Sequence, residues 1–126
     1  MSDALFLDRK AQGTLICRLD ESVKDVVRVV VSGEIDLATA PSLAEALDDA
    51  FVRGVLLVLD LREVSFCDSS GLHLVVCADR RARESGRRLV IVRGPRQVHQ
   101  LLVLTHLDAH LEIIDDPGVV VGQARS

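Results

Sequence analysis

Five consecutive apolar residues, Val55 to Leu59, constrain the fold of this chain more than any other feature. A strand with one face in water alternates apolar and polar side chains, whereas an unbroken apolar run is typical of a strand buried on both faces. Such a strand needs other elements packed against it, which implies layers of helix and sheet. We therefore predict that a central strand follows Gly54 and runs from Val55 to Leu61.

Strand and helix patterns alternate along the rest of the chain. Two β-branched runs, Leu15–Leu19 and Val26–Val31, predict a hairpin, and residues 33–36 are expected to form a loop. Apolar residues three and four apart, with proline near the start, predict helices. The further predicted elements are helices over 41–53, 70–85 and 95–105, and strands over 89–92 and 111–114. The fold class is therefore α/β, with a small mixed, mainly parallel β-sheet and helices packed against it.

One domain accounts for the chain, because 126 residues, 48% of them hydrophobic, can bury one core but are too few for two ordinary domains. We expect this domain to span residues 15–115. Residues 1–14 are predicted to be an N-terminal extension, in which Met1 to Lys10 form either an added edge strand or a frayed end. Residues 116–126 show little periodicity and are expected to be a loose C-terminal tail.

Composition argues against several classes of function. The net charge is −4 and the aromatic content is 2%, so neither a basic surface nor stacking platforms for nucleic acid are expected. The three cysteines form no CxxC pair, and their odd number fits a reducing cytosol. No histidine lies at zinc-ligand spacing from a cysteine, so no metal site is predicted. No apolar run approaches the roughly 20 residues that span a bilayer. These observations favour a cytoplasmic protein without membrane attachment.

The segment Asp68-Ser69-Ser70-Gly71 lies between the central strand and the start of the second predicted helix. A serine at a helix start caps free backbone N–H groups, and the positive end of the helix dipole also favours a phosphate there. Ser69 is therefore a candidate phosphate acceptor as well as a candidate helix cap. Capping alone is the structural alternative for both serines.

Two motifs in this order resemble the STAS domain of bacterial anti-sigma-factor antagonists, also called anti-anti-sigma factors. The first reads VSGEIDLATA and runs from Val31 to Ala40; the second reads LDLREVSFCDSSGL and runs from Leu59 to Leu72. The resemblance continues through Gly94-Pro95 and Leu104–Asp108, and covers roughly residues 15–115. It implies a small mixed sheet backed by helices, in agreement with the prediction from the residues themselves.

The resemblance also implies a function. In that family the serine directly after the motif aspartate, here Ser69, is phosphorylated by an anti-sigma factor that is itself an ATP-dependent serine kinase. The unphosphorylated antagonist binds this kinase and frees the sigma factor; the phosphorylated form is released, and a PP2C-type phosphatase resets it. The candidate partner-binding residues are Glu34, Asp36, Thr39, Asp68, Ser70 and Gly71. The expected protein is a regulator rather than an enzyme, a monomer or weak homodimer that needs no cofactor and binds neither nucleic acid nor membrane.

Several alternatives stay open at this point. Asp36 and Asp68 could be turn residues that bind backbone N–H groups. Cys67 is more typical of a small buried residue than of a reactive thiol. His106 stands where the family commonly has glycine, at the expected end of the third helix, where a left-handed backbone costs roughly 1 kcal/mol.

Two other functions compete with the switch. Cys67 to Gly71 resembles the G-x-S-x-G elbow of hydrolases, with Asp108 and His110 following, but Cys67 replaces a glycine that the strained elbow requires. The chain is also short for a hydrolase sheet. A STAS domain that never switches, serving as a scaffold or nucleotide-binding module of a larger signalling complex, is the remaining alternative.

Overall fold

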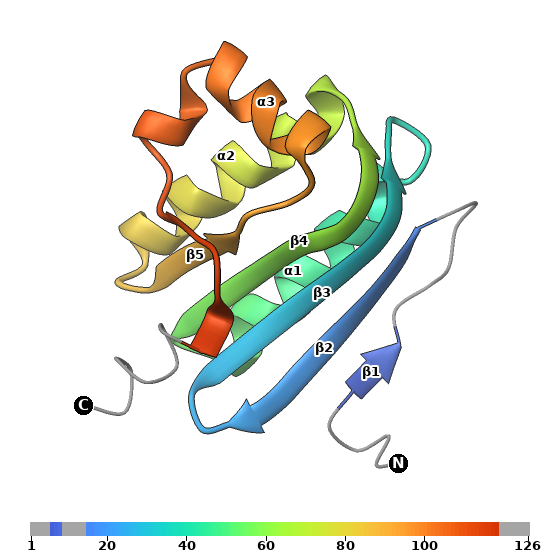
Figure 1. Cartoon of the computed structure of the whole chain (residues 1–126). Helices are drawn as coiled ribbons and strands as arrows, with labels where there is room; N and C mark the ends of the chain where they lie inside the picture. The colour runs from blue at the N-terminus through green and yellow to red at the C-terminus, as the bar shows by residue number, and fades with distance from the viewer. Residues whose placement is uncertain (1–5, 9–14, 119–126) are drawn as a thin grey trace.

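The computed structural model describes residues 6–8 and 15–118 and contains a six-stranded sheet with three α-helices (Figure 1). The strands are β1 (Phe6–Asp8), β2 (Ile16–Val23), β3 (Val26–Ile35), β4 (Leu56–Cys67), β5 (Arg88–Val92) and β6 (Ile113–Ile114). The helices are α1 (Ala40–Arg53), α2 (Ser69–Glu84) and α3 (Arg96–Leu104), with a short 3-10 helix, η2 (Leu107–Ala109). The predicted helices are therefore found within one or two residues of their expected bounds.

The strands lie in the sheet in the order in which they occur along the chain. The pairs β1/β2 and β2/β3 are antiparallel, whereas β3/β4, β4/β5 and β5/β6 are parallel. This confirms the mixed, mainly parallel sheet, and it places β4 in the interior as predicted. β1 corresponds to the edge strand that was one of the two alternatives for the N-terminal extension.

The main core lies between the sheet and the helices. Figure 1 shows α1 behind β3 and β4. Alternate residues of β2, β3 and β4 pack with the apolar faces of all three helices in a single cluster. Leu43 and Phe51 of α1, Val75 of α2 and Leu102 of α3 are each at most 3% exposed. These helix faces therefore fix the positions of the helix starts relative to the ends of the strands.

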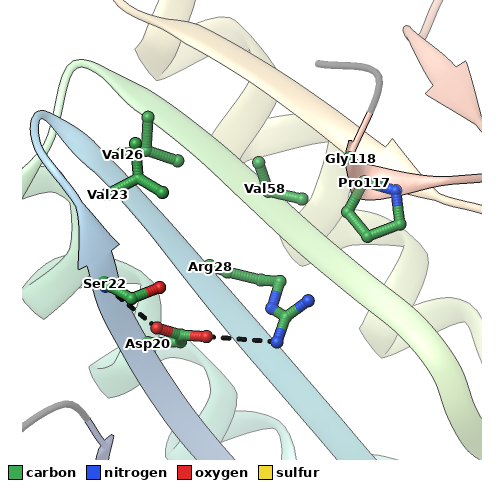
Figure 2. Close-up of a pocket in the computed structure, with 8 residues that line it drawn as sticks. All are labelled: Asp20, Ser22, Val23, Val26, Arg28, Val58, Pro117 and Gly118. Atoms are coloured by element: carbon green, nitrogen blue, oxygen red, sulfur yellow. Dashed lines mark hydrogen bonds and ion pairs between the residues drawn. The ribbon is translucent and has the colours of Figure 1, made fainter. Parts of the chain in front are cut away.

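The second face of the sheet carries a smaller apolar cluster whose described members come from strands. Val58 and Val90 are at most 1% exposed, although they face away from the helical core. Pro117 is also buried, and Figure 2 shows it beside Val58 at a cavity that the Asp20–Arg28 ion pair borders. The second residue of the expected loose tail, Pro117, is thus packed on the sheet, while residues 119–126 lie outside the described part of the chain.

β3 and β4 are longer than predicted. β3 was expected to give way to a loop at Gly33 and β4 to end near Leu61, but pairing continues to Ile35 and Cys67. Both predictions were wrong because they followed the apolar runs, whereas backbone pairing continues through polar residues. Gly33 has φ of 110° at an irregularity in the register, a left-handed backbone that glycine adopts without strain.

His106, which stands where glycine was the expected residue type, has an unusual backbone conformation. His106 adopts φ of 62°, in the left-handed region, directly after the helix end at Thr105. The side-chain hydroxyl of Thr105 donates to the carbonyl of Leu101 at 2.8 Å and closes the last turn. The chain therefore accepts a strained residue where glycine would cost less, as the sequence predicts.

Candidate functional site

The two sequence motifs meet at the C-terminal ends of β3 and β4. Ile35 pairs with Cys67 at the last position of the two strands, and the backbone N–H of Asp68 donates to the carbonyl of Ile35 at 3.1 Å. The loop that begins at Asp36 and the start of α2 are thereby joined directly. Parallel strands place such loops side by side, and exposed residues there are available to a partner.

Asp68 is the N-cap of α2. Its carboxylate accepts hydrogen bonds from the backbone N–H of Ser70 at 2.9 Å and from the Ser70 hydroxyl. The hydrogen bond from the Ser70 hydroxyl, with further help from backbone N–H groups, outweighs desolvation and holds the pKa of Asp68 below its usual value. Asp68 is therefore charged near neutral pH and is engaged within the helix start. This capping geometry agrees with the turn alternative for Asp68.

The two serines of the motif differ in their surroundings. The Ser70 hydroxyl is bound to Asp68, and Ser70 is partly buried. Ser69, the first residue of α2, is exposed, and its hydroxyl has no hydrogen-bond partner among the described residues. A transferred phosphoryl group would therefore reach the Ser69 oxygen without breaking an internal bond.

The loop after β3 is held by reciprocal hydrogen bonds. The Thr39 N–H donates to the Asp36 carboxylate at 3.0 Å, and the Thr39 hydroxyl accepts from the Asp36 N–H at 2.9 Å. The same hydroxyl lies 2.8 Å from the carbonyl of Glu34, to which it donates. Thr39 is only 3% exposed, so its side chain is not available for direct contact with a partner and instead shapes this loop. Asp36 is half-buried and carries a structural role in the turn.

The remaining predicted residues have different environments. Glu34 is exposed beside the loop. Gly71 is buried, and a side-chain carbon there would lie 2.5 Å from the sulfur of Cys67 and 2.7 Å from Cγ2 of Ile35. Gly71 therefore allows α2 to approach the end of β3, and its contribution to any partner surface is through this packing.

Two exposed apolar side chains at this site were missed by the sequence analysis. Leu37 is 80% exposed in the loop after Asp36, and Phe66 is 48% exposed on β4, where it pairs with Glu34. A contiguous exposed apolar patch is typical of a surface that a partner covers, whereas single exposed apolar side chains are ordinary. The signal that could have found Leu37 is its place in a short turn closed by Asp36 and Thr39. Phe66 had no such signal, because its exposure depends on the extension of β4.

The site offers little for other chemistry. Burial, with a smaller effect of the Asp68 charge, raises the pKa of Cys67 to about 11, so this thiol is a poor nucleophile at neutral pH. No group of three or more potential metal ligands occurs within residues 6–8 and 15–118. Over the same residues, no helix is long and apolar enough to cross a membrane.

Comparison with known proteins identifies the family. A family model described as "Mlab, STAS domain" matches residues 18–115. A relative from Listeria monocytogenes named anti-sigma-B factor antagonist is 35% identical over 105 residues, which are 82% of this chain and 92% of the relative. A crystal structure of an anti-sigma factor antagonist from Mycobacterium paratuberculosis is 24% identical and superposes with a TM-score of 0.80, covering 93% of this chain and 99% of that chain.

A further solved structure has the same fold. The Bacillus cell fate determinant SpoIIAA in its phosphorylated form is 15% identical, with a TM-score of 0.67 over 86% of this chain and 98% of that chain. The order of strands and helices, the two motifs and the family-model match agree with one another. The chain belongs to the STAS domain family.

Proposed function

We propose that this protein is an anti-sigma factor antagonist that works by partner switching. Its unphosphorylated form binds an anti-sigma factor serine kinase and releases the sigma factor, and phosphorylation of Ser69 reverses this. The observation that carries the proposal is the exposed Ser69 hydroxyl at the start of α2, which has no hydrogen bond within residues 6–8 and 15–118, while its neighbour Ser70 is engaged. The names of the relatives, anti-sigma-B factor antagonists, support the same class of function.

The partner surface of this proposal surrounds Ser69. Leu37 and Phe66 supply exposed apolar contact area, and Glu34 and Asp68 supply negative charge. Apolar contacts at the centre with charges around them are typical of specific interfaces. We expect the kinase to carry a complementary apolar and basic surface, and a PP2C-type phosphatase to remove the phosphate later.

Phosphorylation should act on the interface rather than on the fold. The phosphate adds bulk and a charge of about −1.5 to −2 next to Asp68, and like charges oppose the rebinding of a surface that fitted the neutral hydroxyl. The positive end of the α2 dipole favours the added charge, so the domain should stay folded. Release then requires no conformational change in the antagonist.

The first test identifies the acceptor. The protein is incubated with its cognate kinase and ATP, and the product is examined by intact-mass spectrometry and peptide mapping. We expect one phosphate on wild type and on Ser70→Ala, and none on Ser69→Ala. Equal phosphorylation of Ser69→Ala would remove Ser69 from the proposal, and a chain that is never phosphorylated would favour the non-switching scaffold.

The second test separates repulsion from unfolding. Ser69→Ala and Ser69→Asp are titrated against the kinase, and their thermal melts are recorded. We expect the Ala variant to bind and the Asp variant to bind more weakly, because aspartate supplies one charge and less volume than phosphate. Both should melt within a few degrees of wild type. Equal affinities would argue against interface repulsion, and a lost fold in the Asp variant would argue against an intact phosphorylated domain.

A further inference from the structure

The last residues of β3 and β4 do not pair one to one. Gly33 pairs with Val64, whereas the next residue of β3, Glu34, pairs with Phe66. β4 therefore has one residue more than β3 at this point, an irregularity of the kind that bends a strand, and Figure 1 shows β4 bending toward its C-terminal end. We propose, on the basis of the switch proposed above, that Gly33 is a positioning residue of the Ser69 site, because its backbone holds the register that turns Phe66 outward toward the kinase.

The irregularity decides which side chains of β4 face the core. Val64 is 0% exposed in the main core, and regular alternation after it would turn Phe66 inward and Cys67 outward. The structure has the opposite arrangement, because Ser65 and Phe66 are both exposed while Cys67 packs against the core. The extra residue thus keeps a large apolar side chain out of the core and puts a small one in its place.

Gly33 supplies the backbone conformation that this register uses. Its φ of 110° lies in a region that side chains rarely allow, and it stands where the register changes. Any residue with a β carbon would favour a regular backbone at this position. Regular pairing would place Phe66 opposite Ile35, which is 1% exposed and belongs to the core.

The start of α2 depends on the same register. Cys67 occupies the position opposite Ile35, and a β carbon on Gly71 would lie 2.5 Å from its sulfur. The first turn of α2 therefore packs on a small side chain, and a phenylalanine ring in that position would push the turn away from β3. Ser69 is the first residue of this turn. The register thus sets two features of the proposed partner surface, the outward ring of Phe66 and the position of Ser69.

Phe66 differs from an ordinary exposed apolar residue. Its 48% exposure results from the register of the strand, since regular alternation would bury it. Burial of an aromatic ring stabilises a domain, so a backbone that exposes one favours a surface that a partner covers. Aromatic side chains are also enriched among the contacts that contribute most to binding. We therefore assign Phe66 to direct contact with the kinase and Gly33 to the support of that contact.

The first experiment tests the register without the kinase. NOEs between the ring of Phe66 and the methyl groups of Ile35 are measured by NMR in the full chain, which has three phenylalanines and no tyrosine or tryptophan. We expect no such NOE in wild type, where the two side chains lie on opposite faces of the sheet, and a clear NOE in Gly33→Ala, where the ring turns inward. A loosened strand would give no NOE, so its absence from a folded Gly33→Ala protein would overturn the proposal.

The second experiment measures the effect on the partner. Wild type, Gly33→Ala and Phe66→Ser are titrated against the cognate kinase, and the rate of Ser69 phosphorylation is recorded. We expect both variants to bind at least ~10-fold more weakly than wild type, with Phe66→Ser melting close to it. Equal affinity in wild type and either variant would overturn the proposal.

Gly86→Ala is the matched control. Gly86 also has a left-handed backbone, with φ of 73°, but it lies beyond the far end of α2, and an added β carbon there would meet no other atom within 4 Å. This variant should lose stability through the same kind of backbone strain and still bind the kinase like wild type. Equal losses of affinity in Gly86→Ala and Gly33→Ala would assign the effect to stability and overturn the positioning role.

A deletion separates the register from the strain. Without Ser65, β4 has as many residues as β3 over this segment, and Phe66 faces outward in a regular strand. Gly33→Ala combined with this deletion should therefore bind the kinase more tightly than Gly33→Ala alone, and a double variant that binds no better would overturn the proposal. If Gly33→Ala alone does not fold, recovery of the fold in the double variant supports the proposal, and failure to recover overturns it. Absence of kinase binding in wild type would instead contradict the proposed function, and this inference with it.

Discussion

Replacing Asp36 should reveal that this residue stabilises the loop beside Ser69. The sequence alone predicts that Asp36→Ala weakens kinase binding with almost no change in melting temperature. The structure changes this prediction, because the Asp36 carboxylate accepts the N–H of Thr39 at 3.0 Å and Thr39 is 3% exposed. Alanine would leave that N–H buried without an acceptor.

The expected loss can be estimated from these contacts. A hydrogen bond to a charged acceptor contributes about 1.5–3 kcal/mol, and the half-buried position of Asp36 reduces this to roughly 1–2 kcal/mol. For a domain of this size the melting temperature should fall by about 3–8 °C. The Thr39 hydroxyl keeps its bond to the Glu34 carbonyl, so the loop should loosen rather than unfold.

Two further variants distinguish the effect of the Asp36 hydrogen bond on the loop from the effect of the Asp36 charge. Asp36→Asn keeps an acceptor oxygen and removes the charge, so it should melt close to wild type. Glu34→Ala removes a neighbouring exposed charge whose side chain makes no described hydrogen bond, so it is the matched control for the thermal melts; as a candidate partner contact, it is not a control for kinase binding. Thermal melts and kinase titrations are recorded for all three. An Asp36→Ala protein that melts like wild type would refute the structural role, and normal kinase binding by Asp36→Asn would exclude a role for the charge.

Two other substitutions test the scaffold. Arg62→Met should leave the buried Asp60 carboxylate without the side chain that binds both of its oxygens. The free energy of unfolding, measured with urea at pH 7, should fall by about 2 kcal/mol, a value already reduced because Arg62 is half-exposed. Burial opposes ionisation of Asp60, but Arg62 holds its pKa below the usual value, so the deficit should shrink as the pH falls below about 4. Gly71→Ala should cost about 1–3 kcal/mol through overlap with Cys67 and Ile35, despite its higher helix propensity; an unchanged melt would contradict the close approach.

Much of the fold could be predicted because its signals are local. The unbroken apolar run of β4 and the periodic apolar faces of the helices depend on residues close in sequence. The ends of β3 and β4 were missed because their pairing depends on two segments about thirty residues apart and continues through polar side chains. A register irregularity such as the one at Gly33 has no local pattern beyond the glycine itself.

In the candidate site, too, features set by nearby residues could be predicted, and features set by the fold could not. Asp68 and Ser69 could be placed at a helix start from sequence, because capping follows local rules. That Ser70 rather than Ser69 binds the Asp68 carboxylate could not be predicted, since both hydroxyls are near it in sequence. The burial of Thr39 depends on how the loop folds over the core, which a single sequence does not specify. The exposure of Phe66 likewise depends on the strand it joins.

The cap at Asp68 bears on how a phosphate at Ser69 would act. Phosphates at helix starts usually accept the free N–H groups of the first turn. In α2 the N–H of Ser70 already binds the Asp68 carboxylate, and the N–H groups of Gly71 and Leu72 donate to the Asp68 carbonyl at 3.1 and 3.2 Å. A phosphate would have to compete with the Asp68 carboxylate for the N–H of Ser70 and with the Asp68 carbonyl for the other two, so it would instead extend outward beside that carboxylate. The added charge would stay near the positive end of the α2 dipole, which keeps the domain folded, and would also face the partner, so a rigid domain is a sufficient switch.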